Sequence, residues 1–449
     1  MQKDLTQGSI TGHLLNMAAF IALGLVFQTL YFLVDLYFVS RLGSAAIAGV
    51  SAAGSAFFLV MGMTQVIAVG AMAIIAQAIG AKDEDGANLA SNQALSLSFA
   101  FAIVTMTVLA LFGGEAIAVV GADAATDAAG RAYLLAFAPG LALMFPSAAV
   151  GAALRAAGIV GAPMVVQTVS VLINAALAPV LIAGWFTDAP LGVAGAGWAS
   201  TIAAAFGCLA QFLLFPRVQK AMRYSWERMR PRMASWGRLV AVGAPAAAEF
   251  LLMFVIFGVV YWVIRDVGPH AQAGFGIGSR IMQSLFLPVM AVAFAAGPVA
   301  GQNFGARNAA RVRETFKQTA LISAALMLAM TAFVHWRPDL LLRPFTDDSD
   351  ALAVAEDYLR VISWNFVASG IVFTCSSMFQ GLGDTRPSLL ASATRLITFA
   401  APAIWLTSQP FFSLHTVWLL SVASVFAQMC FCVLLLRGQF RSKLGPLVV

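Results

Sequence analysis

The apolar positions of this chain gather into long runs separated by short polar connectors. Most runs are about 20 residues long, the length at which a helix crosses the hydrocarbon core of a bilayer. Barrel strands would be about ten residues long with alternating polarity, and that pattern is absent. We therefore predict an all-α polytopic membrane protein with twelve transmembrane helices. The predicted spans are 13–39, 48–78, 92–112, 132–154, 162–184, 193–215, 240–264, 275–300, 316–336, 357–380, 388–407 and 413–436.

Composition supports the same class. Of the 449 residues, 61% are hydrophobic and only 10% are charged, and the mean hydropathy is +0.87. A soluble domain carries roughly a quarter charged residues, so these values exclude an ordinary soluble protein. We expect the lipid bilayer to be the main environment of the chain.

The distribution of basic residues predicts the orientation. With both termini in the cytoplasm, six basic residues face outward, two lie within spans, and the other eighteen of the 26 face inward. The outward six are Arg41, Arg131, Arg265, Arg337, Arg343 and Arg360, and the two within spans are Arg280 and Arg395. An excess of Lys and Arg marks cytoplasmic loops, so we expect both termini inside.

The most basic connector, 217–238, holds seven Lys and Arg against the single acid Glu227. A loop beside anionic lipid explains this charge without nucleic acid, which we do not expect as a partner.

The chain contains an internal repeat. Leu42-Gly43-Ser44-Ala45-Ala46-Ile47-Ala48-Gly49 aligns with Val267-Gly268-Pro269-His270-Ala271-Gln272-Ala273-Gly274 at an offset of 225 residues. The same offset pairs Gln77 with Gln302, Tyr133 with Tyr358 and Gly158 with Gly383. One offset held over such a distance indicates duplication. We predict two homologous six-helix lobes, 1–216 and 239–449, joined by a basic cytoplasmic linker, 217–238.

This duplication favours a carrier. Six helices return the chain to the side from which it entered, so the two lobes are related by an axis along the membrane normal. Carriers built from such repeats bind substrate near the repeat interface and expose it alternately by rocking one lobe against the other.

Several local motifs resemble the multidrug and toxic compound extrusion (MATE) family across nearly the whole chain. The first is Val34-Asp35 followed by Val39-Ser40-Arg41-Leu42-Gly43. The second pair is Ala76-Gln77-Ala78-Ile79-Gly80-Ala81-Lys82 and Ala300-Gly301-Gln302-Asn303-Phe304-Gly305-Ala306-Arg307. The third is Gly151-Ala152-Ala153-Leu154-Arg155-Ala156-Ala157-Gly158 and Gln380-Gly381-Leu382-Gly383-Asp384-Thr385-Arg386-Pro387.

The resemblance implies a secondary active antiporter that exports organic, cationic compounds in exchange for inward H⁺ or Na⁺. It implies small organic cations as partners, no bound cofactor and no catalytic or metal site. It also implies a multi-pass location in the bacterial cytoplasmic (inner) membrane, and we expect a monomer. Family members commonly carry a proline in the inner half of the first span. Here that half has none, so a bend would use Gly24.

Asp35 is the first candidate for coupling. A charged side chain within a span is costly and is kept where it faces a partner, water or a ligand. The resemblance assigns Asp35 to cation coupling with Asn174, while Ser200 and Thr201 are further candidate oxygen ligands. The DinF-like branch of the family has a second acid where this chain has Ala178. Because a hard cation prefers several oxygens, this departure favours H⁺ over Na⁺.

Glu249 is the second acid within the spans and the candidate for substrate binding. It lies about ten residues into the seventh predicted span, near mid-membrane at about 1.5 Å per residue. The NorM-like branch has its seventh-span acid one turn later, at Met253, and its tenth-span acid at Gly370. We also expect the intramembrane polar residues Gln28, Tyr31, Gln283 and Asn365 to contribute to substrate binding.

Two other functions, a lipid flippase and an intramembrane enzyme, agree less well with the sequence. A flippase for lipid-linked oligosaccharides, from the same superfamily, would need a basic cavity for pyrophosphate. The spans instead offer two acids and only Arg280 and Arg395 as bases. For an intramembrane enzyme, the four histidines are scattered near span ends without metal-ligand spacing, and no nucleophile turn is present. We therefore expect a transporter and no enzyme.

Overall fold

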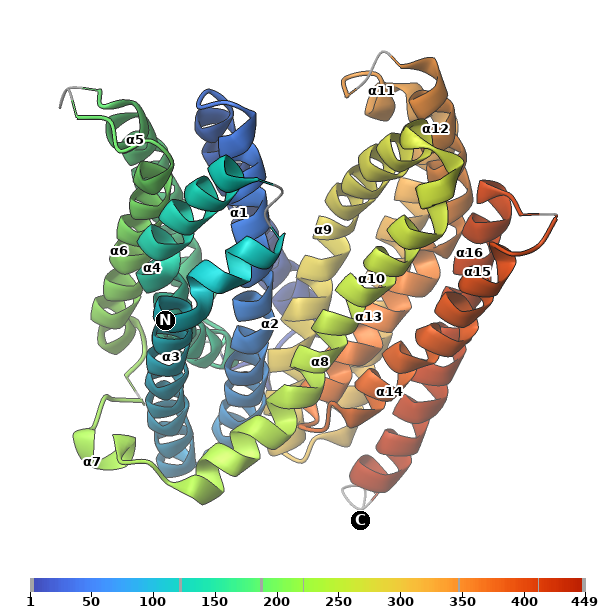
Figure 1. Ribbon diagram of the computed structural model, residues 1–449. Coiled ribbons are helices and arrows are strands. Elements are labelled where there is room, and N and C mark those ends of the chain that lie inside the picture. The colour runs from blue at the N-terminus through green and yellow to red at the C-terminus, as the bar shows by residue number, and fades with distance from the viewer. Residues whose placement is uncertain are drawn as a thin grey trace. The chain divides into compact units, whose positions relative to one another are not determined.

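The computed structural model describes residues 4–120, 123–185, 189–220, 222–345, 348–410 and 412–445, without the side chains at 31, 32, 36, 119 and 120. Nearly all of this part of the chain is helical (Figure 1). Twelve of its helical stretches are long and apolar enough to cross a membrane. The predicted fold class is confirmed.

The first half of the chain contributes one helix to each of the first six spans. They are α1 (Ile10–Ser40), α2 (Ser44–Gly80), α3 (Glu84–Val120), α4 (Ala124–Ala156), α5 (Gly161–Ala183) and α6 (Val193–Val218), followed by the short α7 (Trp226–Met229). Within this half, α4 packs against α2, α3 and α6. Buried side chains such as Ile75, Phe145 and Phe215 fill the core between them.

The second half repeats this order with more interruptions. Its elements are α8 (Met233–Ile264), η1 (Arg265–Val267), α9 (Pro269–Gly305), α10 (Ala309–Trp336), α11 (Pro338–Leu342), α12 (Ser349–Ile362), η2 (Ser363–Asn365), α13 (Phe366–Gly381), α14 (Arg386–Arg395), η3 (Leu396–Ala400), α15 (Ala401–Leu406), α16 (Leu414–Gln439) and η4 (Phe440–Leu444). Four spans are composite, since the seventh adds η1 to α8 and the twelfth adds η4 to α16. The tenth runs through α12, η2 and α13, and the eleventh through α14, η3 and α15.

Many helices extend beyond the predicted spans. The third span was predicted over 92–112, whereas α3 runs from Glu84 to Val120. Hydropathy marks only the apolar part of a helix. The backbone hydrogen bonds continue through polar ends, where acidic residues such as Glu84 and Asp85 suit the helix N-terminus.

The backbone has the same conformation at the two repeated motifs that follow α2 and α9. Lys82 and Arg307 both adopt positive φ, at 58° and 56°. Each follows a helix and closes a Schellman motif. The amide of Asp83 donates to Ala78 O (2.9 Å) and that of Asn308 to Asn303 O (2.9 Å). Positive φ is rare outside glycine, so its occurrence at two repeat-related basic residues shows that both loops have the same shape.

Close helix packing is repeated as well. A Cβ on Gly49 of α2 would lie 2.8 Å from the Thr126 carbonyl oxygen, and one on Gly274 of α9 would lie 2.6 Å from the Ala351 carbonyl oxygen. These four positions correspond at the same offset. Small residues allow helix backbones to approach closely in a membrane protein, which explains glycine at both sites.

The chain forms two compact units whose boundaries differ from the expected lobes. One unit contains 1–4 and 23–247, and the other contains 5–22 and 248–449. Helices α1 and α8 therefore each belong partly to both units. The changes fall after Ala22 and after Ala247, which are repeat-equivalent positions. The lobes predicted at 1–216 and 239–449 follow the sequence repeat, whereas the compact units place 5–22 in the second unit and 217–247 in the first.

Side chains of the second unit hold the N-terminal segment by hydrogen bonds to its backbone. Gln302 Oε1 accepts from the Leu5 amide at 3.1 Å, and Asn303 Nδ2 donates to Leu5 O at 3.1 Å. The Arg311 guanidinium adds bonds to Leu5 O and Gly8 O. Two motif residues from the end of α9 thus serve as an anchor for the start of the chain.

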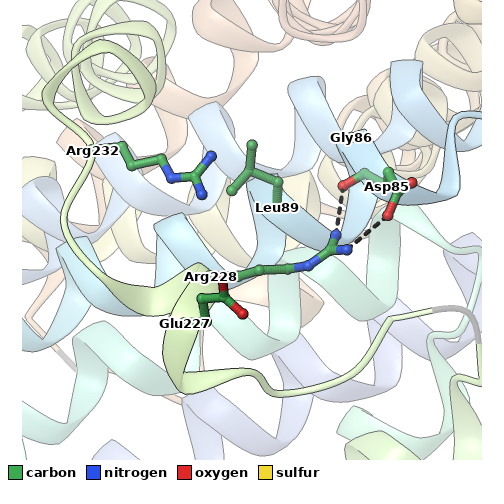
Figure 2. A pocket seen from close by; sticks show the side chains of 6 residues that line it. All are labelled: Asp85, Gly86, Leu89, Glu227, Arg228 and Arg232. Carbon is green, nitrogen blue, oxygen red and sulfur yellow. Dashed lines mark hydrogen bonds and ion pairs between the residues drawn. The ribbon is translucent and has the colours of Figure 1, made fainter.

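The basic linker is likewise fastened, in this case to α3 of the first unit. Asn92 donates to Arg223 O at 2.8 Å, and Gln93 exchanges bonds with the backbone of Arg230 and Arg232. Figure 2 shows the neighbouring surface pocket, in which the Arg228 guanidinium reaches the Asp85 carboxylate at 2.7 Å. Arg228 is paired here, and this pocket lies apart from the intramembrane acids.

Candidate functional site

Asp35 lies in the first unit, on the second half of α1, and its side chain is buried with 6% exposure. The Ser200 hydroxyl on α6 donates to Asp35 Oδ2 at 2.9 Å. Asn174 Nδ2 on α5 donates to the same Ser200 oxygen at 3.3 Å. Three of the four residues predicted for coupling therefore lie together.

Two acceptors in this cluster lack donors. Asp35 Oδ1 and Asn174 Oδ1 are buried and have no hydrogen-bond partner within the described chain. Buried polar atoms are normally paired, and an exception calls for an unseen water, ion or proton. A proton on Asp35 would supply a donor, and a small cation would satisfy both oxygens.

Thr201, the fourth predicted coupling residue, has a different role. Its hydroxyl donates to the Ala136 carbonyl of α4 at 2.7 Å. Tyr133 of α4, which the prediction did not include, lies in electrostatic range of Asp35 and within reach of Ser200. Tyr133 matches Tyr358 in the internal repeat. That match could have drawn attention to Tyr133, but it does not predict a role near Asp35.

Glu249 lies in the second unit, on α8, and is surrounded by hydroxyl groups. Ser376 on α13 donates to Oε1 at 2.7 Å. Ser388 on α14 donates to Oε2 at 2.7 Å, and Ser392 donates to Oε1 at 3.2 Å. Gln428 on α16 donates to Ser392 at 3.1 Å. Four helices of one unit thus build a polar cluster around a single carboxylate.

Sequence reasoning missed these serines. Serine is common in membrane helices and is only weakly polar, so its presence in an apolar run attracts no attention. The available signal is the spacing of Ser388 and Ser392, which places both hydroxyls on one face of α14.

The two acids occupy different positions in the repeat. Asp35 corresponds to Val260, and Glu249 corresponds to Gly24. Each unit has therefore lost, or never gained, the acid of the other, and the two clusters are separate sites with different chemistry.

None of the hydrogen bonds described around Glu249 involves the other predicted substrate residues. Asn365 is buried in η2 of the second unit, eleven residues before Ser376, which is about 16 Å along a helix. Gln283 on α9 is exposed and Gln28 on α1 is half-buried. The side chain of Tyr31 lies outside the described residues.

A third polar group lies at helix ends. His270, Asp348 and Asp350 bring three ligand-type atoms within 4.8 Å of one another, and all three residues are exposed. Asp348 caps α12 through the amides of Asp350 (3.0 Å) and Ala351 (3.3 Å), and its other oxygen bonds His270 Nδ1 at 2.8 Å. This arrangement is that of a helix cap with a histidine contact.

Known proteins resemble both repeats. The MatE family profile matches residues 21–180 and 245–406. The probable multidrug resistance protein NorM of Bradyrhizobium diazoefficiens is 26% identical over 382 residues, covering 83% of this chain and 81% of the relative. The multidrug export protein MepA of Staphylococcus aureus is 24% identical over 439 residues, covering 95% and 94%.

A solved structure of a MATE protein in complex with MaL6 has a similar fold. Its TM-score is 0.91 at 22% identity, and the match covers 98% of both chains. The profile matches both halves of the chain, and the paired motifs lie at equivalent helix ends in each. The chain belongs to the MatE family, the multidrug and toxic compound extrusion family that its motifs resemble.

Proposed function

We propose that this protein is a secondary active multidrug exporter that exchanges organic cations for protons by alternating access in the bacterial inner membrane. The observation that carries the proposal is the Asp35 cluster, a buried carboxylate on a membrane helix with one unpartnered oxygen. Burial out of water favours the neutral carboxyl, and loss of the proton restores a charge that attracts a cation.

The coupling ion is H⁺ rather than Na⁺. The cluster contains one carboxylate and neutral oxygens from Ser200 and Asn174, while Ala178 is fully buried where the DinF-like branch has a second acid. A hard cation such as Na⁺ prefers more oxygen ligands than this cluster offers. A proton needs only the single carboxylate of Asp35.

Glu249 is the group that attracts the positive charge of the substrate in the second unit. Three serine hydroxyls hold its carboxylate in place, and charge attraction strengthens as the local dielectric falls. Glu249→Gln is therefore expected to weaken the transport of cationic compounds more than that of neutral ones. An equal loss for both would indicate a structural role.

Related names support export over lipid flipping. The relatives NorM and MepA are named as multidrug proteins, so the flippase alternative is not favoured. The inward excess of basic residues supports cytoplasmic termini, and the self-contained clusters in each unit support a monomer.

Reconstituted protein tests the proposal directly. Proteoliposomes are loaded with ethidium, a permanent cation, and a pH gradient or an Na⁺ gradient is imposed separately. We expect the pH gradient alone to drive ethidium movement without Na⁺. Movement that requires Na⁺ and ignores the pH gradient would reverse the choice of ion, and no movement under either gradient would contradict antiport.

A further inference from the structure

Arg395 is a cation on a membrane-spanning helix without an anionic partner. It ends α14, and its Nε is buried with no hydrogen-bond partner in the described chain. None of the ion pairs among the described residues includes Arg395. An ionised group within a membrane is costly, and those that persist are paired or serve a ligand pathway. Pairing within the protein does not account for Arg395.

The surroundings of Arg395 reduce the cost of burying its charge but do not neutralise it. The guanidinium lies 5.7 Å from the centre of the Phe399 ring, a cation–π distance. Tyr358 lies in electrostatic range, and its hydroxyl is occupied in donating to the Met282 sulfur at 3.3 Å. An aromatic face and a phenol orient a guanidinium, yet neither supplies the paired oxygens that it binds best.

The backbone after Arg395 is also irregular. Residues Leu396–Ala400 form one π-helical turn, in which the Ala401 amide bonds Leu396 O, five residues earlier. Such turns insert one residue into a helix and are frequent at functional sites. Arg395 is the last residue before this insertion, so its position marks the point where the eleventh span departs from regular geometry.

Arg395 shares a face of α14 with the serines of the Glu249 cluster. Ser388, Ser392 and Arg395 are spaced by four and three residues, which places them in line along one side of the helix. Arg395 lies about 4.5 Å beyond Ser392 along the helix axis. Glu249 bonds both serines but forms no ion pair with Arg395. The second unit thus holds a carboxylate that contacts one turn of α14 and a guanidinium that lies on the next turn, without an ion pair between them.

The repeat shows that this pair belongs to the second unit alone. At the offset of 225, Arg395 corresponds to Ser170 and Glu249 to Gly24. The equivalent positions of the first unit therefore carry no charge. A guanidinium needed only for helix packing would have no reason to accompany the acid.

We propose that Arg395 binds the acidic group of the exported compound, so that Glu249 and Arg395 together form a site for zwitterionic substrates. The ligand class is an organic molecule with a positively charged group and a carboxylate or other oxyanion on one framework. Glu249 takes the cationic end and Arg395 the anionic end through a charge-assisted, two-point hydrogen bond. This inference rests on the export function proposed above and adds the substrate class of the second unit.

A matched pair of dyes tests the site. Rhodamine 110 carries a free carboxylate, and rhodamine 123 is its methyl ester, so the two differ by the group assigned to Arg395. Binding to the full-length protein in detergent is measured by fluorescence anisotropy. We expect Arg395→Gln to weaken rhodamine 110 about tenfold or more, as loss of a charge-assisted bond predicts, and to change rhodamine 123 far less. Arg395→Lys should restore part of the affinity, because it keeps the charge without the planar fork.

The controls separate the possible causes. Arg280 of α9 is an exposed arginine of another membrane-spanning helix, so Arg280→Gln should affect neither dye. Glu249→Gln should weaken both dyes, because both carry the cationic ring system. Phosphatidylglycerol added to the micelles should not displace rhodamine 110. Displacement would assign Arg395 to a lipid phosphate and overturn the proposal.

The remaining outcomes are also decisive. If the wild-type protein binds rhodamine 123 but not rhodamine 110, export of cations stands and the zwitterion site is wrong. If Arg395→Gln weakens both dyes equally, or neither, Arg395 has only a structural role. If the wild-type protein binds neither dye, the zwitterion site is wrong, while the export function is decided separately by the ethidium assay. The wild-type comparison needs no variant, so misfolding of Arg395→Gln cannot hide the result.

Discussion

At the residue scale, the two intramembrane acids differ in how their oxygens are satisfied. Asp35 receives one hydroxyl bond and keeps one buried oxygen without a partner, whereas Glu249 receives three. Hydrogen bonds from hydroxyl groups favour a charged carboxylate, and burial opposes it. The oxygens of Glu249 are therefore already satisfied within the protein, while Asp35 has a free oxygen that a proton would complete.

Asp35→Asn is expected to abolish pH-driven ethidium transport in proteoliposomes. The amide keeps the size of the side chain and a bond to Ser200, but it cannot gain or lose the exchanged proton. Asp266→Asn is the matched control, because Asp266 is exposed and paired only with the neighbouring Arg265 at 3.3 Å. Wild-type transport by Asp35→Asn would remove Asp35 from the coupling mechanism.

At the scale of elements, the paired family motifs lie at the ends of helices and form the turns that follow them. Gly158 and Gly383 follow α4 and α13 with φ of 72° and 70°. Each again closes a Schellman turn, through bonds from Ile159 N to Leu154 O (2.8 Å) and from Asp384 N to Phe379 O (3.1 Å). The residues that carry the family resemblance here therefore determine the shape of the loop that follows the helix.

Gly158→Ala is expected to lower the melting temperature of the protein. A side chain at positive φ costs about 1 kcal/mol because Cβ crowds the backbone. Gly237→Ala is the opposite control. Gly237 lies in α8 with nothing within 4 Å of its Cβ position, so alanine there should be neutral or stabilising. Equal melting temperatures for the two variants would contradict the role assigned to the αL turn.

The cap of α12 should respond to acid. The bond from His270 is the main cause that lowers the pKa of Asp348 below its usual value of 3.8, and the Ala351 amide adds to the effect. A lowered pKa means that the stabilisation is fully present above pH 3.8 and is lost as the pH falls through the lower, folded-state value.

Asp348→Asn should accordingly melt at a lower temperature than the wild type at neutral pH. The difference between the two melting temperatures should close as the pH falls below the usual pKa of the aspartate. Thermal melts in detergent over a pH series measure this. A difference that stays constant over the series would show that the charge of Asp348 contributes nothing.

At the scale of the whole molecule, the units and the repeats do not coincide. Helix α1 changes unit after Ala22 and α8 changes after Ala247, at equivalent positions. Gly24 follows the first change, and Pro245 and Glu249 flank the second. Glycine lowers helix rigidity and proline frees a backbone carbonyl, so both helices are weakened where they pass between units.

Gly24→Ala is expected to slow transport without changing the affinity for rhodamine 123. Alanine favours the straight helix, and nothing lies within 4 Å of the Cβ position at Gly24. Gly54→Ala of α2 is the control, since Gly54 is equally unobstructed but lies within one unit. Transport rates in proteoliposomes and anisotropy in detergent separate the two effects. A normal rate for Gly24→Ala would argue against bending at this position.

The sequence by itself determined the number of spans, the duplication and the two acids. Each of these features depends on the order of residues along the chain and not on contacts between distant segments. A span needs only a run of apolar residues, a repeat needs only one offset, and an acid within an apolar run is conspicuous because burying its charge is costly. The helices extend beyond the predicted spans because their backbone hydrogen bonds continue into polar ends that hydropathy does not mark. Only the structure shows where those bonds stop.

Tertiary structure alone decided the partners of the acids and the membership of the units. Ser376, Ser388 and Ser392 become one site only when α13 and α14 pack beside α8, and no local pattern encodes that meeting. The segment 5–22 joins the second unit because Gln302 and Asn303 bind the Leu5 backbone, nearly 300 positions away. Contacts between distant segments depend on how the helices pack in three dimensions, and the order of residues does not specify that packing by any short-range rule.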